Sequence, residues 1–253
     1  MPPVELAGVV AFLDRFLRVS AVPDAPHALN GLQVANAGAV SRIAAAVDAC
    51  AATIRLAAAQ GADLLLVHHG LFWGGLEPLT GRAYARVAGL VQHNIALYSA
   101  HLPLDVHPEV GNNHLLAGRL GVAVRGAFGE EYGVRLGVWG ELDVPRAELA
   151  RRLERVVGGT PRLLGFGPDA VHKVGIVTGA AGSMIAQAAA QGLDTFVTGE
   201  GSHHTFFVAE ELGLNVFYAG HYATETVGVQ ALAERLGAEF GLPWSFLDHP
   251  SGL

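Results

Sequence analysis

The sequence contains a single cysteine, Cys50, and few charged residues. One cysteine excludes a framework of disulfides within the chain and fits a reducing compartment. Charged residues make up 15% of the 253 positions and hydrophobic residues 51%, so a large disordered segment is not expected. A chain of this length can bury most of its apolar surface, whether it forms one domain or two lobes.

Positive charge is also scarce. The 16 lysines and arginines are outnumbered by 23 aspartates and glutamates, which gives a net charge of −7 and leaves no basic stripe. Such a surface repels phosphate backbones, so we expect no nucleic-acid partner. No apolar run approaches the ~18 residues of a membrane span, and the first residues lack the basic segment of a signal peptide. The sequence therefore predicts a cytoplasmic protein without a membrane partner.

Strand-like and helix-like segments alternate at the spacing of βα units. This alternation predicts parallel sheets with crossover helices, and hence an α/β fold. We expect strands at residues 42–47, 63–67, 95–100, 133–138, 162–165, 173–177, 195–198 and 216–219, helices at 4–18, 51–60, 80–93, 183–191, 204–212 and 225–237, and a charged helix from Pro145 to Val157 opened by Asp143.

The sequence also repeats internally. Residues 40–70 align without a gap with 171–201, most clearly as AAAQGADLLLVHHG against AAAQGLDTFVTGEG. A repeat of this kind predicts two similar α/β lobes, which we place at residues 1–125 and 126–253. Residues 122–170 form the connector between the two repeated series.

The alignment continues into residues that carry chemistry. His101 and Asp105 in the first half correspond to His221 and Glu225 in the second, and each pair follows a strand-like run. If a helix starts at Thr224 or its neighbour, His221 lies one turn before Glu225, so an imidazole and a carboxylate could converge on one cation. His101 and Asp105 could do likewise, although Pro103 makes the span between them irregular. Two such polar clusters at corresponding strand ends could face each other across a cleft.

Two adjacent histidines, His68 and His69, end the apolar strand-like run before Gly70. The carboxyl end of such a strand is where open α/β sheets place ligands. Neighbouring side chains on an ideal strand point to opposite sides, which suits two nearby ions better than one. Nitrogen and carboxylate donors without thiolate favour Zn, Mn, Fe, Co or Ni, and their number is consistent with a two-metal centre.

Each of these residues also has an ordinary structural interpretation. Adjacent histidines can be surface loop residues. Asp105 can cap a helix, and Glu225 can lie in a first helical turn, where the helix dipole favours a carboxylate. The recurrence of both carboxylates in one repeated frame favours the metal site.

A second double histidine, His203 and His204, follows Glu200. We expect Ser202 to cap a helix there, so these histidines would line the cleft or the helix surface and not bind metal. Glu200 occupies the position that corresponds to His69 in the first half, and it could take or give a proton if it faces the cleft.

Apolar residues follow the first double histidine in a loop. Leu71, Phe72 and Trp73 could form an apolar lip over the site or pack in a subunit interface. Cys50 is more typical of a small buried hydrophobe than of a nucleophile.

Six motifs together resemble those of the NGG-interacting-factor-three-like proteins, which are often named GTP cyclohydrolase 1 type 2 homologues. The resemblance extends from about residue 4 to residue 250. The motifs are Asn30-Gly-Leu-Gln-Val34, Val67-His-His-Gly70, Ser99-Ala-His-Leu-Pro-Leu-Asp105, Gly111-Asn-Asn113, Val197-Thr-Gly-Glu200 and Ala219-Gly-His-Tyr-Ala-Thr-Glu225.

The resemblance implies two similar α/β lobes, a dinuclear metal site in the cleft between them, and a ring-like homohexamer. Some family members carry an extra domain between the halves, for which residues 122–170 are too short. His101 matches a position beside the site, and we expect His101 and His203 to support the ligands without binding metal. The family's metal ligands fall on His68, His69, Asp105, His221 and Glu225.

Two functional hypotheses follow from these residues. The first is a metal-dependent hydrolase with a small-molecule substrate, because two divalent ions activate water and stabilise charge on the attacked group. The family name suggests a purine nucleotide, although fold and site type do not fix a substrate. The alternative is a non-enzymatic metal-binding, metal-delivery or regulatory protein, since the same ligands serve both roles. A DNA-binding role conflicts with the net charge of −7.

Overall fold

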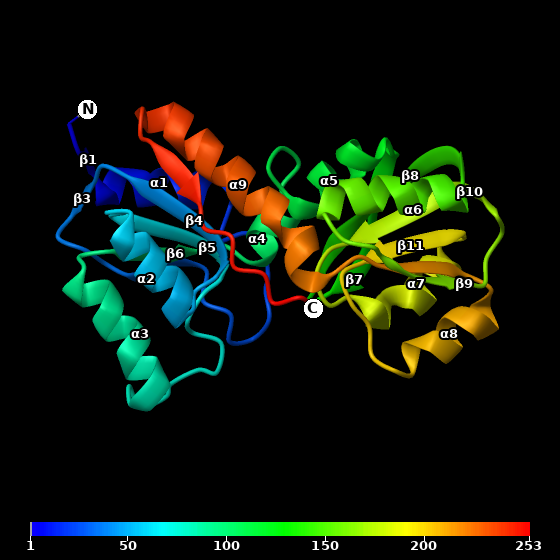
Figure 1. Cartoon of the computed structure of the whole chain (residues 1–253), viewed down its shortest axis with the longest axis horizontal. Coiled ribbons are helices and arrows are strands. Elements are labelled where there is room, and N and C mark those ends of the chain that lie inside the picture. The colour runs from blue at the N-terminus through cyan, green and yellow to red at the C-terminus, as the bar shows by residue number, and fades with distance from the viewer. Residues whose placement is uncertain (1) are drawn as a thin grey trace. The chain divides into compact units, whose positions relative to one another are not determined.

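The computed structural model describes residues 2–253, which divide into two compact units (Figure 1). The first unit contains the residues up to Leu104 together with Gly228–His249, and the second contains Asp105–Val227 with Pro250–Leu253. The predicted boundary between residues 125 and 126 therefore falls inside the second unit. Within residues 2–253, no helix is both long and apolar enough to cross a membrane.

Helices and strands alternate in the first unit, and the predicted α/β class is confirmed. The helix α9 continues from the second unit into the first. The elements of the first unit are β1 (Val4–Glu5), α1 (Leu6–Phe16), β2 (Gly31–Val34), β3 (Ala39–Val40), β4 (Ile43–Asp48), α2 (Ala51–Ala59), β5 (Leu64–His69), α3 (Gly81–Gln92), β6 (Ala96–Ser99), the short α4 (Leu102–Asp105) that ends it, the later part of α9 (His221–Phe240), and β13 (Trp244–Phe246).

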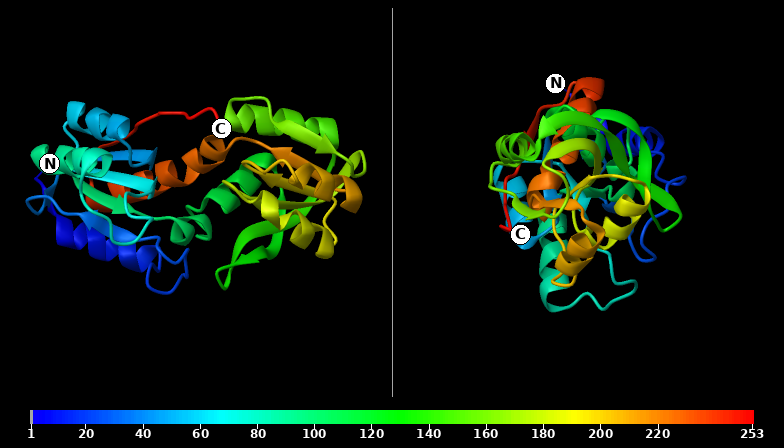
Figure 2. Two further views of the ribbon diagram at one scale, coloured as in Figure 1. Left: turned by 90° about the horizontal axis from the view of Figure 1, so that it is seen from below. Right: turned by 90° about the vertical axis from the view of Figure 1, so that its right-hand side faces the viewer.

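The sheet of the first unit has the strand order β13-β4-β5-β6-β2. β13, β4, β5 and β6 run parallel, whereas β2 is antiparallel to β6. Figure 2 (left) shows α2 and α3 in cyan on one face of this sheet and α1 in blue on the other. Because both faces are covered, β4, β5 and β6 are almost wholly buried, which explains their continuous apolar runs.

Strand register brings polar residues to one edge of this sheet. Asp48 at the end of β4 pairs with His69 at the end of β5, and Val67 pairs with Ser99 at the end of β6. The carboxyl ends of three parallel strands therefore meet at one edge, which is where such sheets hold ligands.

The second unit holds a mixed sheet of strand order β7-β8-β10-β11-β12-β9. β10, β11 and β12 run parallel, and the remaining pairs are antiparallel. Buried leucines of α5 and α6 pack on one face of this sheet. The elements are α5 (Asn112–Leu120), β7 (Ala123–Glu131), β8 (Val134–Pro145), α6 (Arg146–Val157), β9 (Arg162–Gly165), β10 (Ala170–Val177), the 3-10 turn η1 (Gly182–Met184), α7 (Ile185–Ala190), β11 (Thr195–Thr198), α8 (Thr205–Leu212), β12 (Asn215–Tyr218) and the start of α9.

The structure is consistent with the internal repeat. Asp63 Oδ2 accepts hydrogen bonds from the backbone N–H groups of residues 41 and 42, at 2.7 and 3.2 Å. Asp194, its aligned counterpart, does the same for residues 172 and 173, at 3.0 and 2.7 Å. Each aspartate thus holds the backbone near the beginning of a strand in its own sheet, before β4 and within the first half of β10.

The connector differs in one detail from the prediction. Its strand at 162–165 is present as β9, and its helix, α6, follows Pro145. Asp143 does not open that helix, because Pro145 occupies the N-cap position. The Asp143 carboxylate instead accepts a hydrogen bond from His172 at 2.6 Å, on two exposed strand residues.

Candidate metal centres

Three histidines of the first unit lie together at the carboxyl edge of its sheet. His68 and His69 end β5, and His101 lies after β6, just before α4. One ring nitrogen from each lies within 4.8 Å of the others. The ring centroids of His68 and His69 are only 4.6 Å apart. Alternation along the strand therefore does not separate these two rings.

All three rings direct Nδ1 at an oxygen atom that can only accept a hydrogen bond. The Nδ1 atom must then carry a proton, which leaves Nε2 as the nitrogen that can offer a lone pair. Metal-binding histidines in proteins are held in this way, by a carboxylate or a carbonyl on the second ring nitrogen. The contacts are His68 Nδ1 to the carbonyl oxygen of Ala100 at 2.9 Å, His69 Nδ1 to Asp48 Oδ1 at 2.9 Å, and His101 Nδ1 to Asp24 Oδ1 at 2.8 Å.

Asp24 is fixed by residues of the Asn30 motif. Asn30 Nδ2 donates to Asp24 Oδ2 at 2.7 Å, while Asn30 Oδ1 accepts the backbone N–H of His101 at 2.7 Å. Burial by itself would raise the pKa of Asp24, but the hydrogen bonds from His101, Asn30 and Ala25 outweigh it and lower the pKa. The carboxylate is thus held in its charged form beside the His101 ring.

The loop after the double histidine is anchored at its start. The Leu71 N–H donates to Gln33 Oε1, and Trp73 Nε1 donates to the carbonyl oxygen of Gly70, at 2.7 and 2.8 Å. The Trp73 ring lies edge-on to His101, with centroids 4.8 Å apart, and 5.8 Å from the His69 ring. Trp73 therefore packs directly on the histidine cluster.

The second unit holds its own histidine and carboxylate pair. His221 begins α9 and Glu225 follows one turn later, with 3.3 Å between His221 Nε2 and Glu225 Oε2. His221 Nδ1 lies 2.8 Å from Glu200 Oε1, so this ring repeats the pattern of the other three. The hydrogen bond to Glu225 raises the pKa of His221 to about 9, with Glu200 acting in the same direction and burial opposing it.

Glycine at position 179 makes room for this pair. A Cβ atom at Gly179 would lie 2.2 Å from Glu225 Oε1, and the backbone φ there is +70°. Glu225 is 3% exposed, so its carboxylate reaches the strand end only because residue 179 lacks a side chain.

Asp105 is buried and held by side chains of the second unit. Its Oδ1 accepts hydrogen bonds from Asn112 Nδ2 at 2.8 Å and from Thr178 Oγ1 at 3.4 Å. Asn113, also buried, donates to the carbonyl oxygens of Asp105 and Leu136. These contacts explain the Gly-Asn-Asn motif: its two amides fix the Asp105 carboxylate and the backbone beside it.

The remaining candidates take other positions. His203 and His204 are exposed, and His203 packs against the Phe207 ring, with centroids 5.6 Å apart. Helix α8 begins after His204, and Ser202 provides no side-chain cap. Glu200 holds the His221 ring and lines two pockets of the second unit, of about 550 and 420 Å³.

The donors in these clusters are imidazole nitrogens and carboxylate oxygens, and they fit a divalent ion of the transition series. The oxygen atoms at Nδ1 of His68, His69 and His101 carry this fit, because a histidine must offer a lone pair to bind metal and Nε2 is then the nitrogen that can offer it. The chain can therefore hold metal through its buried histidine and glutamate groups.

Sequence reasoning missed three residues that hold the candidate ligands or their neighbour His101. Asp48 ends a buried strand next to β5, and its place at the same sheet edge was a usable signal. Asp24 carries no such signal, because it lies in a loop between prolines. Asn112 was part of a quoted motif, but nothing in the motif alone indicated a role for its amide.

Comparison with known proteins agrees over almost the entire chain. The family model Duf34/NIF3 (NGG1p interacting factor 3) matches residues 4–250. A Deinococcus radiodurans protein named GTP cyclohydrolase 1 type 2 homolog is 46% identical, with 97% of this chain and 93% of that protein aligned. A Halobacterium salinarum protein of the same name is 45% identical, covering 99% of this chain and 100% of that one.

Solved structures agree as well. The protein TTHA1606 from Thermus thermophilus superposes with a TM-score of 0.90 at 44% identity, covering 99% of this chain and 100% of that one. Since both the family model and these relatives match nearly all of its residues, the chain belongs to the Duf34/NIF3 family.

Proposed function

We propose that this protein binds two divalent metal ions and uses them to hydrolyse a nucleotide-like substrate. The observation that carries the proposal is the shared arrangement of the proposed histidine ligands, His68, His69 and His221, each held at Nδ1 by an oxygen as metal-binding histidines are. The proposed ligands are His68, His69, Asp105, His221 and Glu225, and the proposed ions are Zn, Mn, Fe, Co or Ni.

Donor number supports a dinuclear centre. A catalytic ion commonly takes three protein ligands, so two ions would need about as many donors as the five proposed ligands supply. A carboxylate that binds both ions would supply a donor to each of them. Glu225 and Asp105 are the buried carboxylates among the proposed ligands.

Bound divalent ions would supply Lewis acidity, lower the pKa of water and stabilise charge on the attacked group. The chain's own residues prepare the ligands for this role. Asp48 and Glu200 fix the rings of His69 and His221, and the buried carboxylates supply negative charge. We propose that His101, held by Asp24 and packed on Trp73, positions its neighbours and does not bind metal.

Glu200 is our candidate for proton transfer. Its side chain is 44% exposed, and only Oε1 contacts His221. A carboxylate at the wall of an open pocket can exchange a proton with a bound molecule, while its hydrogen bond to a ligand holds it in place.

The substrate class rests on the names of relatives, several of which are GTP cyclohydrolase 1 type 2 homologs. We propose a purine nucleotide opened by water at its ring. The test is a screen of nucleotides, phosphodiesters and cyclic amides with the metal-loaded protein. We expect a turnover that is lost in His69→Ala and in Glu225→Gln and kept in His203→Ala. Full metal content with no turnover on any of these compounds would contradict the hydrolase and support metal delivery.

We further propose that copies of the chain assemble as a homohexamer in the cytoplasm. Several large apolar side chains support assembly because they are exposed on the loop before α3 and on α3 itself: Leu76, Leu79, Tyr84 and Val91.

A further inference from the structure

We propose that a pocket between the Leu71–Leu79 loop and α3 binds the phosphate of a nucleotide through Arg82 and Arg86. The pocket lies wholly in the first unit and has a volume of about 330 Å³. Only the identification of this nucleotide with the substrate rests on the proposed function. The proposed binding itself follows from the residues of the pocket alone.

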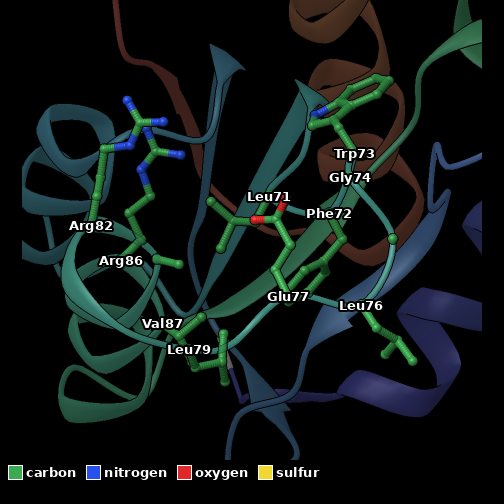
Figure 3. Close-up of a pocket in the computed structure, with 12 residues that line it drawn as sticks. Leu71, Phe72, Trp73, Gly74, Leu76, Glu77, Leu79, Arg82, Arg86 and Val87 are labelled. Atoms are coloured by element: carbon green, nitrogen blue, oxygen red, sulfur yellow. The ribbon is translucent and has the colours of Figure 1, made fainter.

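Arg82 and Arg86 bring two positive charges together on α3. They are four residues apart on α3, so they share one face of the helix, and Figure 3 shows their guanidinium groups side by side. Among residues 2–253 neither arginine has a hydrogen-bond or ion-pair partner, and the Arg86 Nε atom is buried. Two adjacent positive charges without a counter-ion repel each other, and a doubly charged anion removes that repulsion.

Two other helices of the chain pair their arginines with carboxylates. On α6, Glu148 pairs with Arg151 and Arg152, and on α9, Arg235 pairs with Glu239 four residues later. Helix α3 contains no acidic residue. The positive charge on its pocket face is therefore left for a ligand to neutralise.

The other walls of the pocket suit a flat apolar group. Phe72, Leu79 and Val87 line it together with the arginines (Figure 3). Its volume lies at the lower end of the range for small-molecule sites, which suits a mononucleotide better than a larger ligand. Aromatic and aliphatic side chains would contact a heterocyclic base while the guanidinium groups hold the phosphate.

Glu77 is the carboxylate among the lining residues. Its Oε1 atom lies close to Gly74, where an added Cβ would be 2.4 Å away, so its position depends on that glycine. A carboxylate in the pocket repels phosphate. Removing its charge should therefore strengthen the binding of a nucleotide.

The pocket adjoins the histidine cluster through Trp73. This residue lines the pocket and packs on the rings of His69 and His101. Trp73 thus forms part of the wall between the pocket and the histidines of the same unit.

The test measures the binding of GMP, guanosine and inorganic phosphate to the chelator-treated protein by calorimetry, so that no metal holds the phosphate. We expect GMP to bind more tightly than guanosine or phosphate alone. Arg82→Gln and Arg86→Gln should each weaken GMP binding by about tenfold or more, and Glu77→Gln should tighten it. Arg55→Gln, an exposed arginine on α2, is the matched control and should leave binding unchanged.

Circular dichroism checks that each variant is folded, and light scattering measures its oligomeric state. Equal affinity for GMP and guanosine, or no effect of either arginine substitution, would overturn the proposal. A changed oligomeric state with unchanged GMP affinity would also overturn it, because the arginines would then serve an interface. Arginine-dependent GMP binding without any hydrolysis would retain this site and reject the hydrolase.

Discussion

Four oxygen atoms fix the Nδ1 side of the rings of His68, His69, His101 and His221. Three belong to the carboxylates Asp24, Asp48 and Glu200, and the fourth is the carbonyl oxygen of Ala100. A carboxylate on Nδ1 both fixes the ring and increases the basicity of Nε2. Metal affinity in this protein should therefore depend on residues that never touch the metal.

Replacing Asp48 with asparagine tests this dependence. Asparagine can still accept the hydrogen bond from His69 Nδ1, but it brings no charge, so metal affinity should fall roughly tenfold. Competition with a chromogenic chelator measures the change. Asp143→Asn is the control, because Asp143 contacts the exposed His172 and none of the candidate ligands. Equal metal affinities in the Asp48 variant and the wild type would show that the Asp48 carboxylate does not strengthen metal binding through His69.

Tyr98 offers a stability test with a pH signature. Its buried hydroxyl donates to Asp14 Oδ1 at 2.7 Å, and burial together with Asp14 raises its pKa well above the usual value. Tyr98→Phe should lower the free energy of unfolding by about 2 kcal/mol near neutral pH, as measured with denaturant.

The sign of the pH effect follows from the raised pKa. The stabilisation by Tyr98 is complete below the unfolded-state pKa of about 10 and is lost as pH rises further, because only the unfolded tyrosine ionises readily there. The difference in the free energy of unfolding between the wild type and Tyr98→Phe should therefore become smaller above about pH 10. Tyr84→Phe, on an exposed side chain, is the control. A difference in the free energy of unfolding that grows as the pH rises would contradict this prediction.

The sequence predicted part of the candidate site. The double histidine could be found because it ends an apolar run, and the His221 and Glu225 pair because it recurs in the repeat. Asp24 could not be assigned to a histidine, since its partner lies 77 residues away in the chain, and Asp48, 21 residues from His69, offered only its place at the same sheet edge. Only the fold brings such residues together.

At the scale of elements, burial made the central strands of the first unit easy to predict, although β9, a mostly exposed edge strand, was also predicted. β4, β5 and β6 are covered on both faces and read as continuous apolar runs. β2 and β7 lie at the edges of their sheets, where one side lacks a neighbouring strand, and their mixed composition shows no such run. The start of α9 was placed four residues late, because its first turn carries the polar residues His221 and Thr224.

The strand end at Gly179 supplies a test of local geometry. Gly179→Ala should displace the Glu225 carboxylate, since the added Cβ would lie 2.2 Å from Oε1. Gly158→Ala is a matched control: its φ is +73°, close to the +70° of Gly179, and nothing lies within 4 Å of the added atom. Both variants should lose about 1 kcal/mol of stability from the left-handed backbone. Only Gly179→Ala should lose metal, and retained metal in that variant would exclude Glu225 as a ligand held in this position.

At the scale of the whole molecule, each unit has its own sheet and its own buried core. Substitution of one polar ligand should therefore leave both cores folded. The chain has a net charge of −7 and few basic residues. An assembly of such chains would repel phosphate backbones, which argues against a nucleic-acid role.

Assembly is the next prediction at this scale. We expect light scattering at micromolar concentration to give the mass of a hexamer of the 26.3 kDa chain. Leu76→Ser should weaken assembly if this fully exposed leucine is covered by another copy. A monomer or dimer for the wild type would contradict the proposed hexamer.

The most direct test of the central claim is the number of metal ions per chain, measured by mass spectrometry of the elements on folded protein. The wild type should bind two ions, and Glu225→Gln should lose metal because a neutral amide cannot replace a buried carboxylate that shares a cation. His203→Ala, which changes an exposed histidine, should keep both ions. Two ions in the Glu225 variant, or loss of both in the His203 variant, would show that the ligands have been assigned to the wrong residues.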